Sequence, residues 1–172
     1  MAGELDRAIF LGTGTGNELL GLDGMVGVQT LAHNAAITGY SPLLLARKQL
    51  MAANARQVSA YVAHPDVDAE FGSLVDTTGQ PLQHPPILDR PTPMRFLTTT
   101  QLPTNLGVGT NEATIYCGDF SQLVIGLRSD VRIEILKERY ADQLQYGFLC
   151  HARYDVVAVQ PQALCRITGV QL

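Results

Sequence analysis

Apolar and polar residues alternate over long stretches in the last third of the chain, and this pattern constrains the fold more than any other feature. Val131, Ile133 and Ile135 alternate with Arg132 and Glu134. Successive side chains of a strand point to opposite faces, so this spacing predicts a strand with one apolar face. By similar signals we expect strands over residues 113–118, 123–127, 131–138, 146–159 and 163–167.

Helical signals lie in the first half of the chain. Ser41 is a good helix N-cap and Pro42 suits the first helical position, and the strong helix formers after them predict a helix over residues 41–56. A second helix is predicted over residues 65–74, where a proline can open it and acidic residues follow in the first turn. A short buried strand is expected over residues 58–63. Helices in the first half and strands in the second indicate the α+β class.

Loops are predicted between these two halves. Residues 81–93 hold five of the nine prolines, which is typical of an extended surface loop. Asp76-Thr77-Thr78-Gly79 is close to an aspartic-protease signature, but no second copy exists to supply the paired carboxylate. We interpret it as a turn in which Asp76 bonds nearby backbone and Gly79 supplies a positive φ. A strand-like stretch over residues 95–102 and an exposed loop over 104–112 follow.

Composition excludes several classes of protein. Twelve Lys and Arg against 16 Asp and Glu give a net charge of −4, which argues against a free-standing nucleic-acid-binding protein, because such proteins neutralise phosphates with clustered cations. The longest apolar runs are about five residues, far short of the ~20 that a membrane helix needs. The first six residues lack the basic and apolar regions of a signal peptide. The 172 residues, of which 46% are hydrophobic, predict one soluble folded domain with a real core.

The residue pattern does not support metal or catalytic chemistry. Cys117, Cys150 and Cys165 are widely spaced, and we interpret them as reduced, small core residues. Cys150 and His151 are adjacent, but neighbours on a strand point to opposite faces and could not share an ion. The four histidines are scattered, and no nucleophile or acid-pair motif is visible. We therefore expect no catalytic, cofactor-binding or metal-binding residue.

A glycine-rich segment, Gly12-Thr13-Gly14-Thr15-Gly16, leaves one alternative open. It follows a short helical or extended run over residues 4–11. A dinucleotide-binding turn would need a glycine where this chain has Asn17, and a βαβ unit around it. We interpret the segment as a flexible connector. The alternative function is a small cytosolic α+β enzyme or ligand-binding domain that uses this glycine loop.

Several short motifs follow one another in an order that is known from one family. Gly118-Asp119-Phe120 stands ahead of an apolar strand, and a strand that bears Arg153 leads to Pro161 and a last strand. With the other similar segments, these motifs resemble the major capsid proteins of tailed bacteriophages. The similar segments are residues 6–18, 21–22, 61–65, 74–79, 116–126, 132–135 and 150–164.

This resemblance implies the Hong Kong 97-type capsid fold and a division of the chain into four parts. Residues 1–28 would be a peripheral-domain remnant and connector, and residues 29–128 the axial domain that meets other copies around capsomer axes. Residues 129–160 would be the long strands of the peripheral domain, and residues 161–172 a return to the axial domain. The family's N-terminal arm, extended loop and spine helix have no counterpart here. The chain is therefore expected to be a C-terminal portion of such a subunit, either a designed truncation or the product of a broken prophage gene.

Some relatives crosslink their subunits through a Lys and an Asn with the help of a Glu. Aligning Arg153 with the family's Arg places His151 at the position of the Glu and Leu144 at the position of the Asn. These departures put self-crosslinking in doubt, and we carry over no catalytic residue.

The function that the resemblance implies is structural, not enzymatic. The chain would bind its own copies in capsomers and in an icosahedral shell that encloses DNA without sequence-specific binding. A scaffold and a maturation protease are further implied partners, and no cofactor or membrane is. The implied location is the virion capsid, with expression from a prophage in the cytoplasm of a bacterial host. We expect open strand edges in residues 129–160 to mediate dimers or higher oligomers.

Overall fold

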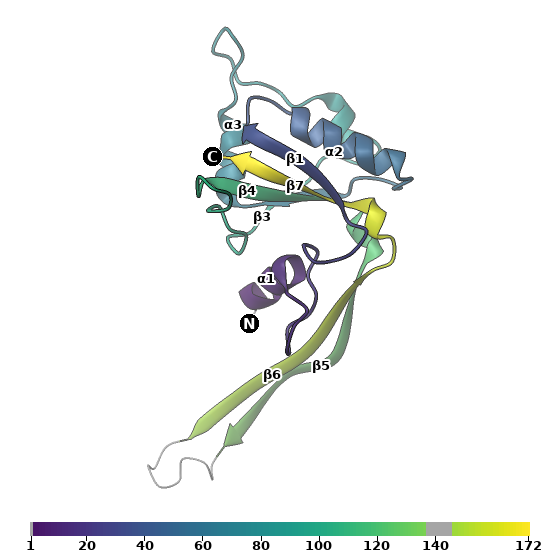
Figure 1. Cartoon of the computed structure of the whole chain (residues 1–172), viewed down its shortest axis with the longest axis vertical. Coiled ribbons are helices and arrows are strands. Elements are labelled where there is room, and N and C mark those ends of the chain that lie inside the picture. The colour runs from purple at the N-terminus through teal and green to yellow at the C-terminus, as the bar shows by residue number, and fades with distance from the viewer. Residues whose placement is uncertain (1, 137–145) are drawn as a thin grey trace.

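A mixed five-stranded sheet carries a long two-stranded ribbon at one end (Figure 1). The computed structural model describes residues 2–136 and 146–172. Helices and strands both form the body of this part of the chain, and the predicted α+β class is confirmed.

The sheet has the strand order β1-β7-β4-β2-β3. Its central strand, β4 (Glu112–Gly118), runs antiparallel to β7 (Leu164–Gln171) on one side and to β2 (Ala60–Ala63) on the other. The outer strands, β1 (Gln29–Ala36) and β3 (Phe96–Thr98), pair in parallel with β7 and β2. Strands from both halves of the sequence therefore share one sheet.

Both faces of the sheet are covered, which explains why β4 is buried along nearly its whole length. Ile115 and Cys117 belong to one hydrophobic cluster, whereas Tyr116 between them belongs to a second one on the opposite face. α2 (Ser41–Ala52) and α3 (Pro65–Ser73) contribute to the first cluster, and α1 (Ala2–Leu11) contributes to the second. The helical side chains involved are Leu43, Ala46, Leu50, Val67 and Phe71 on the first face and Phe10 on the second.

The first predicted helix is shorter than expected and differs at its start. α2 begins at Ser41, so the N-cap residue is Tyr40, which makes no side-chain capping bond, and the assignment of Ser41 as N-cap is wrong. The helix ends at Ala52 and not at residue 56, because Asn54 adopts a φ of 60°, a left-handed conformation that an α-helix does not accommodate.

The segment from α3 into the following turn agrees with the prediction. α3 opens on a proline, and the Nδ1 atom of its N-cap, His64, accepts a hydrogen bond from the N–H of Asp66 (3.2 Å). In the turn after it, Asp76 Oδ1 accepts from the N–H of Thr78 (2.7 Å), and Gly79 has a φ of 81°. This is the backbone-bonding Asp turn that the sequence indicates.

Several predicted strands need correction, including the last one, which was expected over residues 163–167 and continues to Gln171 as β7. Residues 123–127 and 131–136 form one strand, β5 (Leu123–Leu136), because its ladder with β6 (Gly147–Ala158) continues through the residues between them. The last two residues of the predicted strand, 137–138, lie outside the described residues. β1 was not predicted, and the strand-like stretch over residues 95–102 is reduced to β3.

Two chain crossings join the sheet to the ribbon, and they are hydrogen-bonded to each other. The N–H of Asp119 donates to the carbonyl of Ala163 (2.9 Å), and the N–H of Val159 donates to the carbonyl of Gln122 (2.8 Å). We call these crossings the elbow. Because the two bonds hold the crossings together, the elbow determines the direction in which the ribbon leaves the sheet.

Gly118, at the start of the elbow, provides a test of this rigidity. A Cβ there would lie 2.3 Å from the carbonyl oxygen of Ala163, and its φ of 146° is one that other residues rarely adopt. We expect Gly118→Ala to lower the free energy of unfolding by about 2–4 kcal/mol, measured by urea denaturation. Gly72→Ala is the control and should be neutral or slightly stabilising, since no atom lies within 4 Å of a Cβ at that helical position. A Gly118→Ala protein as stable as the wild type would contradict this account of the elbow.

Candidate interaction surface

The ribbon of β5 and β6 projects away from the sheet, and most of its residues are exposed or half-buried (Figure 1). β6 is regular, whereas the pairing register shifts twice on the β5 side, between Leu127 and Ser129 and between Ser129 and Arg132. These irregularities place extra residues in β5 and bend the ribbon locally. Cross-strand partners lie on the same face of the ribbon, so the register assigns each side chain to a face.

One face of the ribbon, which we call the apolar face, carries no charged residue. Ile125 is paired with Val156 near the sheet, and Ile135 is paired with Phe148 near the far end. From β5 the face receives Leu123, Ile125, Leu127, Val131, Ile133 and Ile135, and from β6 it receives Phe148, Cys150, Ala152, Tyr154, Val156 and Ala158. The alternation predicted for the stretch that begins at Val131 is thus present in β5 up to Leu136, whereas the two register shifts interrupt it between Leu127 and Arg132.

The part of the apolar face nearest the sheet is only partly covered, because Ile125 and Leu127 of β5 are 48% and 55% exposed. Val156 is 6% exposed, and a hollow of about 690 Å³ lies between α1 and the middle of the ribbon. Its apolar lining comes from Leu5 and Ala8 of α1 and from Ala152 and Tyr154 of β6, with further residues beside them. α1 therefore shields only the stretch of the apolar face that lies next to the helix.

The far part of the apolar face is uncovered. Ile133 is 67% exposed, Ile135 55% and Phe148 70%. Exposed apolar patches rimmed by polar residues are typical of interaction sites. Within the described residues no further strand pairs with the outer edge of β5 or β6, and a two-stranded ribbon is marginal by itself in water. The far part of the apolar face is therefore a candidate interaction surface.

The glycine loop bonds its polar groups internally. The N–H and hydroxyl of Thr13 donate to the Glu18 carboxylate (3.2 and 2.6 Å), and the N–H of Gly14 donates to the carbonyl of Leu19 (3.1 Å). Arg7 also forms an ion pair with Glu18. A phosphate site would need these N–H groups to be available to an outside anion. The loop instead binds a carboxylate of its own chain.

This arrangement changes the acidity of Glu18. Hydrogen bonds from the Thr13 hydroxyl, from Arg7 and from the Thr13 N–H stabilise the ionised carboxylate and lower the pKa of Glu18 from 4.5 to about 2. Hydrogen bonds to Glu4 and to Glu18 raise the pKa of Arg7 above its ordinary value. Both side chains are charged over the whole physiological range, and they tie α1 to the glycine loop.

The cysteines are only partly where the sequence places them. Cys117 and Cys165 are buried and face each other on β4 and β7, as core residues should. The hydrogen bond with Cys165 and complete burial raise the pKa of the Cys117 thiol. Cys150 lies exposed on the ribbon, so its prediction as a core residue is wrong.

The other candidate positions are distributed as follows. Arg153 and His151 lie on β6, on the face opposite the apolar one, and Leu144 lies outside the described residues. The described residues contain no group of three His, Cys, Asp or Glu side chains that could hold a metal ion. No helix among them is long and apolar enough to span a membrane. The expectation of no catalytic, cofactor-binding or metal-binding residue stays a prediction.

Comparisons with known proteins agree with the arrangement of sheet and ribbon. The sequence model of the Phage capsid family matches residues 1–169. No curated protein matches the chain significantly. Family membership therefore rests on the family model, with the fold compared separately.

Three solved structures illustrate the likeness in fold. The capsid of an empty GTA particle has a TM-score of 0.67 at 15% identity, covering 95% of this chain and 60% of that one. Mycobacterium phage Ogopogo has 0.67 at 12% identity, covering 96% and 63%. The holo-SrpI encapsulin complex from Synechococcus elongatus has 0.65 at 17% identity, covering 99% and 62%. This chain thus spans less than two thirds of the length of each.

The depressed pKa of Glu18 predicts a pH dependence. Ionised Glu18 stabilises the fold above pH 4.5, and this stabilisation is lost as the pH falls from 4.5 toward 2. We expect Glu18→Gln to melt at a lower temperature than the wild type at pH 7, and its melting temperature to fall less steeply below pH 4.5. Asp6→Asn, an exposed change on the same helix, should keep the wild-type slope. Identical slopes for Glu18→Gln and the wild type would refute the role of Glu18.

Proposed function

The chain belongs to the phage capsid family, and we propose that it is a structural subunit that binds its own copies to build capsomers and a closed shell around DNA. Its Hong Kong 97-type fold agrees with the resemblance drawn from the sequence. The observation that supports the proposal most is the uncovered far part of the apolar face, with Ile133, Ile135 and Phe148 in water.

Burial of this surface gives a driving force for association. Moving one Ile or Phe side chain from water to an apolar environment stabilises by about 1.5–3 kcal/mol. The open strand edges beside it add hydrogen-bonding groups that another chain can pair. In a symmetric assembly the same contact recurs in every copy, so a modest contact is multiplied over the shell. Association of this kind needs complementary surfaces and no catalytic group.

The five-stranded sheet and the ribbon are separate parts of the molecule, which supports assigning them different roles in the shell. We assign the axial role to residues 29–128 and 161–172, and the peripheral role to residues 1–28 and 129–160. The five-stranded sheet lies within the first set, and most of the ribbon lies within the second. The boundary after residue 128 falls inside β5, which already begins at Leu123. A boundary at the elbow would fit the ribbon better.

Partners and location follow from the same proposal. The subunit would act without turnover, meet a scaffold and a maturation protease during assembly, and enclose DNA without binding a particular sequence. Its place would be the virion capsid, after expression in the host cytoplasm. A net charge of −4 is consistent with a shell that encloses DNA without binding it strongly.

The alternative of a nucleotide-using enzyme is not favoured, because the N–H groups of Thr13 and Gly14 already donate to the Glu18 carboxylate and to the carbonyl of Leu19. A ligand that binds only the native state raises its melting temperature. We therefore expect millimolar ATP with Mg²⁺ to leave the melting temperature unchanged in a thermal-shift assay. A rise of several degrees that depends on ATP concentration would revive the alternative.

Self-association is tested by light scattering over a range of protein concentrations. We expect the wild type to form dimers or larger species as concentration rises, and Ile133→Ser with Phe148→Ser to shift the midpoint by about tenfold or more toward higher concentration. Leu45→Ser is the control, since it removes a 47% exposed apolar side chain from α2, away from the ribbon. A wild-type protein that remains a strict monomer at high concentration would overturn the proposal.

A further inference from the structure

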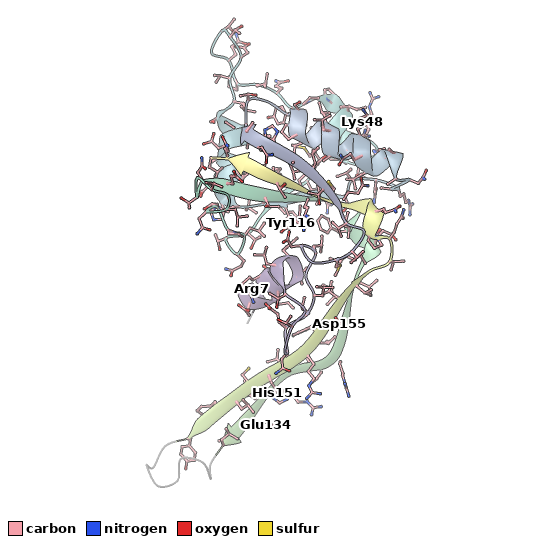
Figure 2. All side chains as sticks on the ribbon, in the orientation of Figure 1. Arg7, Lys48, Tyr116, Glu134, His151 and Asp155 are labelled. Carbon is pink, nitrogen blue, oxygen red and sulfur yellow. The ribbon has the colours of Figure 1, made fainter. Side chains whose placement is uncertain are left out.

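The face of the ribbon opposite the apolar face carries a second feature that self-association through apolar residues does not use. A hollow of about 1020 Å³ lies between β6 and the end of the glycine loop. Arg128, Arg153 and His151 line it, and so do two acids, Glu18 and Asp155. Asn17 and, from the apolar face, Ala152 and Tyr154 also contribute to the lining. Figure 2 shows His151 and Asp155 on the ribbon, well away from the sheet. We call this the cationic hollow.

The arginines of the cationic hollow have no partner within the described residues. Neither Arg128 nor Arg153 makes a hydrogen bond or ion pair there, in contrast to Arg7 and Arg166, which both do. Nδ1 of His151 is buried and has no hydrogen-bond partner. Charged and polar groups left unpaired in a hollow favour a ligand that brings opposite charge.

Two acids share the hollow with these arginines, and among the described residues an ion pair compensates the charge of only one of them. The Glu18 carboxylate is held by Thr13 and Arg7. Asp155 Oδ1 accepts from the N–H of Val156 (2.8 Å). Arg132 lies directly opposite His151 in the β5–β6 register and adds a further cation at this level of the ribbon. An incoming carboxylate would therefore meet Arg128, Arg153 and Arg132 against one acid, Asp155, whose charge no cation in the described part of the chain compensates.

The same chain presents an acidic surface of matching character. Residues 57–89 contain five Asp or Glu and no Lys or Arg. Three of the acids, Asp66, Asp68 and Glu70, are exposed on α3. Asp66 pairs with His64, whereas the side chains of Asp68 and Glu70 have no partner among the described residues. α3 thus offers carboxylates that are not neutralised within the subunit.

These two surfaces cannot meet within one subunit, because α3 covers the sheet and the cationic hollow lies along the ribbon (Figures 1 and 2). We propose that the cationic hollow binds the acidic helix α3 of a second copy of this chain. The contact joins two different surfaces, so it is heterologous and propagates from copy to copy into rings or extended arrays. This inference rests on the proposed function and identifies one pair of surfaces through which it operates.

Charge exchange between the two surfaces is the decisive test. We expect Arg128→Glu with Arg153→Glu to weaken association by about tenfold or more, and Asp68→Arg with Glu70→Arg to do the same. An equimolar mixture of the two double variants should regain association, because the reversed hollow of one then faces the reversed helix of the other. Arg56→Glu with Arg95→Glu, two exposed arginines on the sheet body, is the matched control and should leave association unchanged. Circular dichroism melts establish that each variant is folded.

Several outcomes would overturn the inference. Wild-type association that is unaffected by the double variants, or double variants whose mixture fails to recover, would exclude the pairing while leaving the proposed function intact. If the hollow variants instead lose affinity for a duplex oligonucleotide or for inorganic phosphate, and associate as the wild type does, the ligand is a phosphate and not α3. A wild type that never associates would remove the proposed function itself. Association that weakens as NaCl is raised from 50 to 500 mM supports the pairing. Salt at physiological ionic strength screens exposed charges that lie more than about 8 Å apart.

Discussion

The pairing of β4 between β7 and β2 is the interaction on which the rest of the structure depends. β4 is the central strand, and residues such as Ile115 and Tyr116 bury alternate faces at 0% and 1% exposure. Because both faces of this strand are apolar, the sheet must be covered on both sides. α2 and α3 cover one side, and α1 with its connector covers the other. The folding of the first half of the chain is thus completed by a strand from the second half.

The end of β4 also sets the position of the ribbon. Asp119 is completely buried there, and its Oδ1 accepts from the N–H (3.2 Å) and the hydroxyl (2.7 Å) of Ser121, while its N–H bonds the returning chain at Ala163. These bonds resist rearrangement, because breaking them would leave buried polar groups without partners. The ribbon is therefore held at a defined angle, with its apolar face partly under α1 and partly in water.

That unequal covering sets the ribbon apart from the rest of the subunit. The polar groups of the glycine loop form hydrogen bonds within the subunit. The apolar face of the ribbon remains exposed to water, and the arginines of the ribbon have no partner among the described residues. Groups that are satisfied internally stabilise the subunit, and groups that are not provide the free energy for association. The proposed shell function follows from where these unsatisfied groups lie.

The sequence by itself determined the α+β class, the helix α3 with its following turn, and the alternation that makes one face of the ribbon apolar. These features depend on local signals: a proline, an Asp-to-backbone bond, and a period of two. Only the tertiary structure decided that β1 is a strand, because its residues lack a β-branched run and are held by pairing with β7. It also decided that β5 is continuous and that the glycine loop closes on Glu18, since both depend on partners distant in the chain or on the geometry of a turn. Pairing between distant segments leaves no trace in local spacing, and for this reason the exposed and covered parts of the ribbon could be told apart only in three dimensions.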